Sequence, residues 1–212
     1  MVKRHAPVGR IFVAAWVALC VGGSVLAFAA RGAGLLPGDL ALTRSLQKLP
    51  PDSALGTLLS YAGEVVWFLA IAALAVALLM SRWLAALFIL LASLTGVFIG
   101  EALKLLVASP RPSAELVRVV DPQQGNGFPS STALLSVVLL GMIVYLIWQP
   151  RRSVAVVAMG ISPLMVLLIG LSRVYVGEHW ATDVVGGWLF GGAWLLVLVA
   201  AHRWWVFRRA KS

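Results

Sequence analysis

The chain has 212 residues, of which 61% are hydrophobic and 12% charged, and its formal net charge at pH 7 is +9. A composition this apolar excludes an ordinary soluble globular domain and indicates a membrane protein. Cys20 is the single cysteine, which excludes an intrachain disulfide and a cysteine metal cluster.

Six apolar stretches follow one another along the chain, each close to the ~20 residues that a helix needs to cross a bilayer. They cover residues 11–30, 62–80, 83–103, 131–149, 153–171 and 184–201. Backbone polar groups in lipid must be hydrogen-bonded within their own segment, so we expect helices. The sequence predicts an all-α, polytopic helical bundle that forms a single membrane domain over residues 1–212. The first stretch also fits a secretory signal peptide, because basic residues precede it and Ala-Phe-Ala lies near its end.

A Pro- and Gly-bounded loop, residues 31–60, separates the first two predicted spans. Within it Leu42, Leu46 and Leu49 recur at helical spacing, while Arg44 and Lys48 lie elsewhere on the helical wheel. This pattern predicts a short helix in the membrane interface. A plain solvated loop explains the composition equally well.

The basic residues are distributed unevenly between the two sides of the predicted bundle. The side with both termini and the turns after the second and fourth spans holds ten of the seventeen Lys and Arg residues and none of the eight acids. Those ten are Lys3, Arg4, Arg10, Arg82, Arg151, Arg152, Arg203, Arg208, Arg209 and Lys211. The positive-inside rule makes this side cytoplasmic. The sequence therefore predicts a multi-pass protein of the bacterial inner membrane with cytoplasmic termini.

The C-terminal segment 202–209 contains both aromatic and basic residues. Such a mixture occurs in nucleic-acid-binding segments, but directly after a membrane span it favours an anchor that contacts anionic lipids. Membrane lipids, and no nucleic acid, are therefore the predicted partners of this segment.

Three polar clusters lie at the outer ends of the predicted spans, at residues 104–112, 128–132 and 172–183. We expect them to meet at one depth, on the periplasmic or extracellular face. Taken singly, each has a simpler explanation: a lysine can snorkel or pair with Glu101, a serine can cap a helix, and a His–Asp pair can be an isolated polar contact. The candidate site residues are Lys104, Arg111, Ser130, Arg173, His179 and Asp183, with Ser131, Thr132 and Ser172 as further candidates.

Together these side chains suit phosphoryl chemistry. Two guanidinium groups and an ammonium group can bind phosphoryl oxygens and offset the charge that spreads over them during transfer. Ser130 and the backbone N–H groups of the following helix would add donors. His179 and Asp183 are four residues apart, hence on one face if a helix begins near His179. The carboxylate can then hold one ring nitrogen and leave the other as a nucleophile.

The spacing of the three clusters resembles the signature of the type 2 phosphatidic acid phosphatases. Lys104 is followed after six residues by Arg111-Pro112, Pro129-Ser130 opens a predicted helix, and Ser172-Arg173 is followed by His179 and Asp183 at the family's spacing. The resemblance implies a lipid phosphatase without metal or cofactor. His179 would form a phosphohistidine, Asp183 would orient it, and Lys104, Arg111, Ser130 and Arg173 would bind the phosphate.

The second cluster departs from the family pattern. The family reads Pro-Ser-Gly-His, and its histidine protonates the leaving oxygen, whereas this chain ends the motif in Ser131-Thr132. A threonine hydroxyl does not titrate near neutral pH and cannot supply that proton. Glu178 and Asp121 are conceivable substitutes, although a solvated carboxylate is the simpler interpretation of each. A substitution engineered to trap a substrate would also leave a threonine at this position.

The missing proton donor affects which substrate is expected. An alkoxide leaving a phosphomonoester needs a proton, whereas a phosphate leaving a diphosphate is already a stable anion. The sequence therefore predicts an integral membrane lipid phosphatase or phosphotransferase that acts on a (di)phosphorylated lipid, with polyprenyl diphosphate favoured. The alternative is a non-catalytic relative that binds or transports a phosphorylated lipid. The lipid chain, the acceptor and the oligomeric state are left open.

Overall fold

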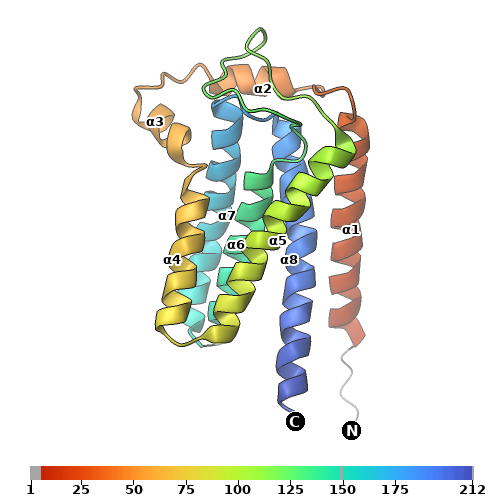
Figure 1. Ribbon diagram of the computed structural model, residues 1–212, viewed down its shortest axis with the longest axis vertical. Helices are drawn as coiled ribbons and strands as arrows, with labels where there is room; N and C mark the ends of the chain where they lie inside the picture. Colours follow the sequence, from red (N-terminus) through yellow and green to blue (C-terminus); the bar gives the residue numbers. More distant parts are fainter. Residues whose placement is uncertain (1–5, 149, 212) are drawn as a thin grey trace.

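The computed structural model describes residues 6–148 and 150–211, and within them all regular structure is helical (Figure 1). The prediction of an all-α, polytopic protein is therefore confirmed. The helices are α1 (Ala6–Ala30), α2 (Asp39–Leu46), α3 (Ala54–Tyr61), α4 (Val65–Leu79), α5 (Trp83–Val107), α6 (Ser131–Trp148), α7 (Arg152–Tyr175) and α8 (Ala181–Arg209).

Helices occupy all six predicted spans, but one of the spans is broken. In the described part of the chain, α1, α5, α6, α7 and α8 are each long and apolar enough to cross a membrane. Helix α4 has only 15 residues. It meets α3 at an angle of 59°, and the two together form a sixth candidate span. The break falls at Ala62, Gly63 and Glu64, beside the site described below.

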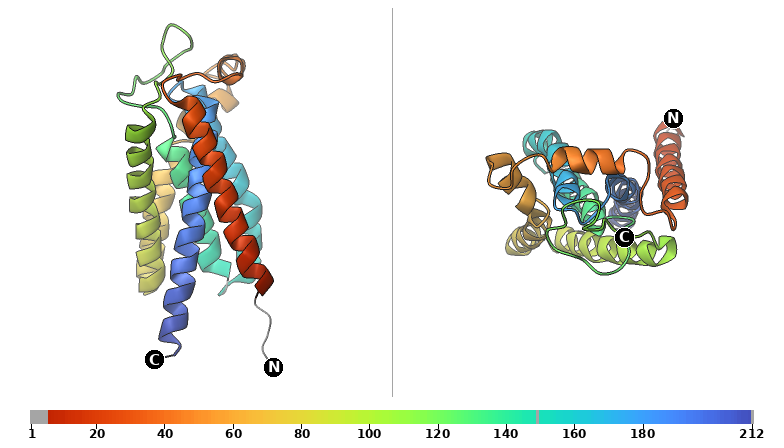
Figure 2. Two further views of the ribbon diagram at one scale, coloured as in Figure 1. Left: turned by 90° about the vertical axis from the view of Figure 1, so that its right-hand side faces the viewer. Right: turned by 90° about the horizontal axis from the view of Figure 1, so that it is seen from above.

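Helix α6 lies at the centre of the bundle and packs against α5, α7 and α8 (Figures 1 and 2). Its first three turns are largely buried, which fits a helix with neighbours on all sides. Gly187 and Gly191 on α8 face the α6 backbone, and added Cβ atoms would lie 2.6 Å from the Ser130 carbonyl oxygen and 2.7 Å from that of Leu134. These glycines allow the two helices to approach closely, as small residues do in membrane bundles.

The outward surface of the bundle is apolar, as expected for contact with lipid. Large hydrophobic side chains on its outer helices are strongly exposed, including Phe28, Leu79, Phe98 and Leu105 at 73% to 85%. A surface with so many exposed apolar side chains is a liability in water and is stable in a bilayer.

Helix α8 extends well beyond the predicted span, to Arg209, because the aromatic and basic tail remains helical. The Arg208 guanidinium lies 4.8 Å from the Trp204 ring centroid, and that of Arg209 lies 3.7 Å from Trp205. Residues four apart on a helix are neighbours, which explains both pairs. Helix α1 begins and α8 ends at the same end of the bundle, opposite α2 (Figure 1).

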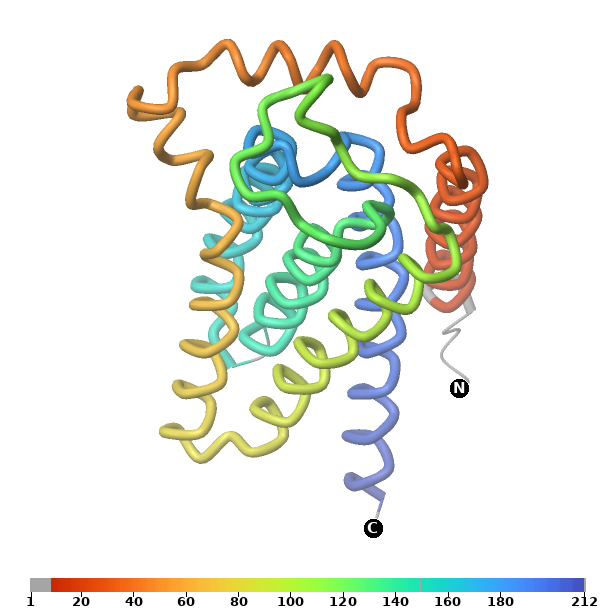
Figure 3. The backbone as a smooth tube through the Cα atoms, turned by 45° about the horizontal axis from the view of Figure 1, so that its top comes forward, coloured from red at the N-terminus to blue at the C-terminus, as the bar shows by residue number. Residues whose placement is uncertain are grey.

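Residues 31–60, the predicted loop, contain α2 and nearly all of α3, so the interpretation of this segment as a plain solvated loop is wrong. Helix α2 lies across one end of the bundle (Figures 1 and 3). Asp39, 2% exposed, fixes it there by accepting hydrogen bonds from the Thr182 backbone N–H (2.9 Å) and hydroxyl (2.7 Å). Leu46 and Leu49 pack near Tyr175, although Leu49 follows the end of the helix. Helix α2 is thereby tied to the first turn of α8.

Candidate active site

The three polar clusters converge at the end of the bundle that α2 covers. Arg111, in the connection between α5 and α6, lies with its Nη1 3.4 Å from His179 Nε2 and 2.9 Å from the Glu178 carbonyl oxygen. The Ser130 backbone N–H donates to the Asp183 carbonyl oxygen at 3.0 Å. The first and second clusters therefore both contact the third, between α7 and α8 (Figure 3).

The contacts of His179 define the state of its ring. Its Nδ1 lies 3.4 Å from Asp183 Oδ2, and its Nε2 faces the Arg111 guanidinium. A guanidinium has only donors, so this contact favours Nε2 as the acceptor and the tautomer with its proton on Nδ1, the nitrogen nearer the carboxylate. The arrangement therefore presents an unprotonated Nε2 beside a cation.

Asp183 is fixed by its position in the first turn of α8. Its Oδ2 accepts a hydrogen bond from the Trp180 backbone N–H at 2.9 Å, and the residue is fully buried. A carboxylate near a helix N-terminus is stabilised by the helix dipole. An added Cβ at Gly127 would lie 2.9 Å from Oδ2, so the connection between α5 and α6 closes directly over this carboxylate.

Burial favours the neutral form of the His179 imidazole. The ring is removed from solvent, which lowers its pKa below the ordinary value. The nearby carboxylate of Asp183 raises the pKa, and the positive charges of Arg111 and Lys104 lower it again. Burial also lowers the pKa of Arg111, which nevertheless stays charged at any physiological pH. A neutral imidazole with an unprotonated Nε2 is the form that a nucleophile requires.

Arg173 lies in the last turn of α7, 4% exposed, within hydrogen-bonding reach of two carboxylates. Its Nη1 is 3.2 Å from Glu64 Oε1 and 3.1 Å from Glu178 Oε2. The interpretation of Glu178 as a solvated carboxylate is therefore wrong: its side chain is 16% exposed and paired. Asp121, in contrast, is exposed.

Ser172 lies behind Arg173. Its hydroxyl oxygen accepts hydrogen bonds from Arg173 Nη2 (3.2 Å) and from the Gly63 backbone N–H (3.0 Å). An added Cβ at Gly63 would collide with the Arg173 guanidinium. The sequence made Ser172 a further candidate site residue. In the structure its hydroxyl connects the backbone at the break between α3 and α4 to the Arg173 side chain.

Lys104 and the start of α6 share one carboxylate, that of Glu101. Lys104 Nζ lies 2.7 Å from Glu101 Oε1, and the Ser131 hydroxyl donates to the same oxygen at 2.8 Å. The pairing of Lys104 with Glu101 that the spacing suggested is present.

Ser130 is fully buried, and its Oγ accepts a long hydrogen bond (3.4 Å) from the Ala133 N–H, as a helix cap does. Thr132 is half-buried in the first turn of α6.

Sequence reasoning missed Glu64, Gly63 and Asp39 as parts of the site and its support. One signal was available for Glu64, because an acidic residue inside a predicted span indicates a functional contact. No local pattern distinguishes Gly63 from the other glycines. The contact between Asp39 and Thr182 joins residues 143 apart, beyond the reach of any local spacing argument.

Comparison with known proteins relates the chain to lipid phosphatases. It is 31% identical over 115 residues to the lipid phosphate phosphatase delta of Arabidopsis thaliana. The matched region covers 47% of this chain and 28% of that protein. It is 32% identical over 106 residues to an undecaprenyl-diphosphatase of Sulfolobus acidocaldarius, covering 49% of this chain and 48% of that protein. The chain spans less than half the length of both curated relatives.

The fold and a family model agree with these similarities. A transmembrane PAP2-type phosphatidylglycerolphosphate phosphatase from Bacillus subtilis has a similar crystal structure, with a TM-score of 0.73 at 22% identity over 88% of this chain and 94% of that one. The model of the PAP2 superfamily matches residues 82–207, which include all three polar clusters. The match covers more than half of the sequence, and the chain therefore belongs to the PAP2 superfamily.

Proposed function

We propose that the protein is a membrane lipid phosphatase or phosphotransferase that acts through a phosphohistidine on His179. The observation that carries this proposal is the buried His179, which has a carboxylate at one ring nitrogen and a guanidinium at the other. A purely structural histidine has no need of an unprotonated nitrogen beside a cation. The curated relatives of this chain are named as lipid phosphate and undecaprenyl diphosphate phosphatases.

In the proposed reaction the terminal phosphoryl group lies between His179 Nε2 and the cations Lys104, Arg111 and Arg173. The Nε2 lone pair forms a bond to phosphorus, and the bond from phosphorus to the bridging oxygen breaks, leaving its electron pair on that oxygen. Asp183 accepts a hydrogen bond from Nδ1–H and stabilises the cationic ring. The oxygen of water, or of an acceptor hydroxyl, then bonds to phosphorus, the phosphorus–Nε2 bond breaks with its electron pair returning to Nε2, and the proton of the attacking oxygen passes to solvent.

The cations supply the positive charge that phosphoryl transfer needs, so we expect turnover without a metal ion or cofactor. The Arg111 guanidinium can form two parallel hydrogen bonds to phosphoryl oxygens. The Ser130 hydroxyl and the N–H groups at the start of α6 add neutral donors.

A lipid diphosphate is the substrate that this site favours. Position 132, where the family keeps a proton-donating histidine, is a threonine. Absence of a general acid typically costs about 10²- to 10⁴-fold when the leaving group needs a proton. A lipid phosphate leaving from a diphosphate avoids that cost. Polyprenyl diphosphate is therefore the proposed substrate, in line with the name of the Sulfolobus relative.

A panel of lipid phosphates tests the activity. Purified protein in EDTA is expected to release phosphate from a polyprenyl diphosphate, and His179→Ala should abolish both turnover and the acid-labile phosphoenzyme. Turnover that stops on chelation and returns with magnesium would contradict the metal-free mechanism. A phosphoenzyme that survives in His179→Ala would place the nucleophile elsewhere.

The role of position 132 has its own test. Thr132→His, combined with Ser131→Gly to make room, restores a group with a pKa near 6.5 that can protonate a leaving alkoxide. We expect monophosphate turnover to rise by about 10²-fold and diphosphate turnover to change little. The ratio of the two rates is independent of expression level. Equal gains on both substrates would mean that position 132 acts through packing or binding.

The alternative function is a non-catalytic protein that binds or transports a phosphorylated lipid. Thr132 favours it, because the site lacks a titratable donor where relatives have one. Measured affinity for a lipid diphosphate, without turnover of any lipid phosphate by either the natural protein or the Thr132→His variant, would support it over the enzyme.

We also propose that the termini are cytoplasmic and that the site faces the periplasm or cell exterior, because ten bases and no acids lie on the side of the termini. With Cys20 replaced, a cysteine introduced at residues 118–124 should react with an impermeant thiol reagent on intact cells. A cysteine placed after Arg209 should not react. The opposite labelling pattern would reverse the orientation.

A further inference from the structure

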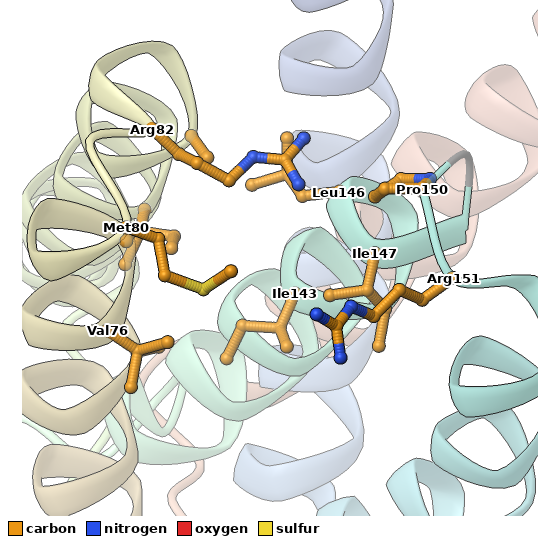
Figure 4. A pocket seen from close by; sticks show the side chains of 12 residues that line it. Val76, Met80, Arg82, Ile143, Leu146, Ile147, Pro150 and Arg151 are labelled. Atoms are coloured by element: carbon orange, nitrogen blue, oxygen red, sulfur yellow. The ribbon is translucent and has the colours of Figure 1, made fainter.

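A pocket lies at the opposite end of α6 from the candidate active site, where α4, α5, α6 and the turn before α7 meet (Figure 4). Its volume is about 260 Å³, close to the ~300 Å³ lower limit of small-molecule sites. Helix α6 has 18 residues, so at 1.5 Å per residue the two sites are separated by about 27 Å.

The interior of this pocket is apolar. Ala77 and Ile89, which are 7% and 5% exposed, are its most deeply buried lining residues, and Ala73, Val76 and Ile143 complete much of the wall. Such a surface offers no hydrogen bonds to a sugar, nucleotide or peptide backbone. It suits a hydrocarbon chain, which gains from burying methylene groups against it.

The mouth of the pocket is basic. Arg82, in the turn between α4 and α5, and Arg151, before α7, both line it, and both are exposed. In Figure 4 the two arginine side chains extend from different turns toward the middle of the pocket. Each arginine directly precedes a long helix, so the positive ends of the α5 and α7 dipoles add to the same potential. All eight acids of the chain lie on the other side of the bundle.

We propose that this pocket binds an anionic phospholipid of the leaflet that contacts the α4–α5 and α6–α7 turns. The phosphate accepts hydrogen bonds from Arg82 and Arg151, and an acyl chain occupies the apolar interior. The combination of an apolar pocket with a basic rim at the membrane surface matches both parts of such a lipid and no free inorganic anion. A bound phosphate would link the α4–α5 turn to the α6–α7 turn, because Arg82 lies in the first and Arg151 in the second.

Native mass spectrometry of the full-length protein in detergent tests the proposal. Phosphatidylglycerol and phosphatidylcholine with identical chains are added in competition. We expect one phosphatidylglycerol to be retained preferentially. Arg82→Gln with Arg151→Gln should reduce its affinity about 30-fold, since each basic residue near an anionic lipid contributes about fivefold.

Arg152→Gln is the matched control. It removes one positive charge directly beside Arg151, but Arg152 is the first residue of α7, lies 5.4 Å from the Trp148 ring centroid and is not among the residues that line the pocket. The control should retain the lipid as the natural protein does. Equal loss in Arg152→Gln, or no preference of the natural protein for phosphatidylglycerol, would overturn the proposal.

A second measurement guards against a variant that simply unfolds. Phosphatidylglycerol should raise the thermal unfolding midpoint of the natural protein and of Arg152→Gln, because a ligand that binds only the folded state stabilises it. It should leave the midpoint of the double variant unchanged, with phosphatase activity retained. An equal rise in all three proteins would show that the pocket is not the binding site.

Discussion

Gly63 offers a test of the site from a residue outside the family signature. An added Cβ there would collide with the Arg173 guanidinium, while the backbone is not in the positive-φ region, so Gly63→Ala should act through this collision alone. Moving Arg173 would remove its proposed charge-assisted contact to the phosphoryl group, and such a contact is worth about 1.5–3 kcal/mol. That loss corresponds to roughly a 10- to 150-fold decrease in kcat/KM.

The assay is phosphate release from a lipid diphosphate by four proteins: natural, Gly63→Ala, Arg173→Ala and the double variant. If Gly63 acts through the arginine, adding Gly63→Ala to Arg173→Ala should cost nothing further. Gly160→Ala is the control, because an added Cβ at Gly160 has no neighbour within 4 Å. Unchanged kcat/KM in Gly63→Ala, or losses that add fully in the double variant, would refute the reasoning.

Two further predictions concern the histidine and the α2 contact. Because burial lowers the pKa of His179, its nucleophilic form persists in mild acid, and the acid limb of kcat/KM should have its midpoint below ~6.5. Asp183→Asn removes the negative charge that raises the pKa of His179, so the midpoint should fall further while kcat drops by about 10²- to 10⁴-fold. An acid limb with its midpoint above ~6.5 in the unmodified protein would contradict the assignment of His179 as the nucleophile. Asp39→Asn places an amide N–H₂ against the Thr182 donors and should destabilise the protein by about 2–4 kcal/mol in thermal unfolding, whereas the exposed Asp52→Asn should not.

The apolar stretches were sufficient to predict the class of fold, and the orientation inferred from the charge asymmetry stays a prediction. A membrane span has to be long, apolar and helical, so its sequence signal is strong and local. The break between α3 and α4 was not predicted, because the stretch around Gly63 and Glu64 remains apolar on average. At the break the Gly63 N–H donates to the Ser172 hydroxyl, a contact between residues 109 apart that no local pattern reveals.

The geometry of the candidate site was predictable where the spacing of residues along one helix determines how close their side chains lie. His179 and Asp183 are four residues apart, and the start of α8 brings them together as expected. The surroundings of Arg173 were not predictable, since Glu64 is 109 residues away from it in the chain. Glu178 was assigned to solvent because its immediate neighbours give no indication that an arginine is buried beside it.

The glutamates that pair with Lys104 and Arg173 have a consequence for product release in the proposed reaction. Glu64 and Glu101, with side chains 58% and 57% exposed, form ion pairs that are individually weak and easily exchanged. Both are attached to the protein, so they compete with orthophosphate at the high effective concentration of a tethered group. If Lys104 and Arg173 bind the product phosphate as proposed, Glu64 and Glu101 compete with it for these cations, which would shorten its residence and return the site to its resting charge balance.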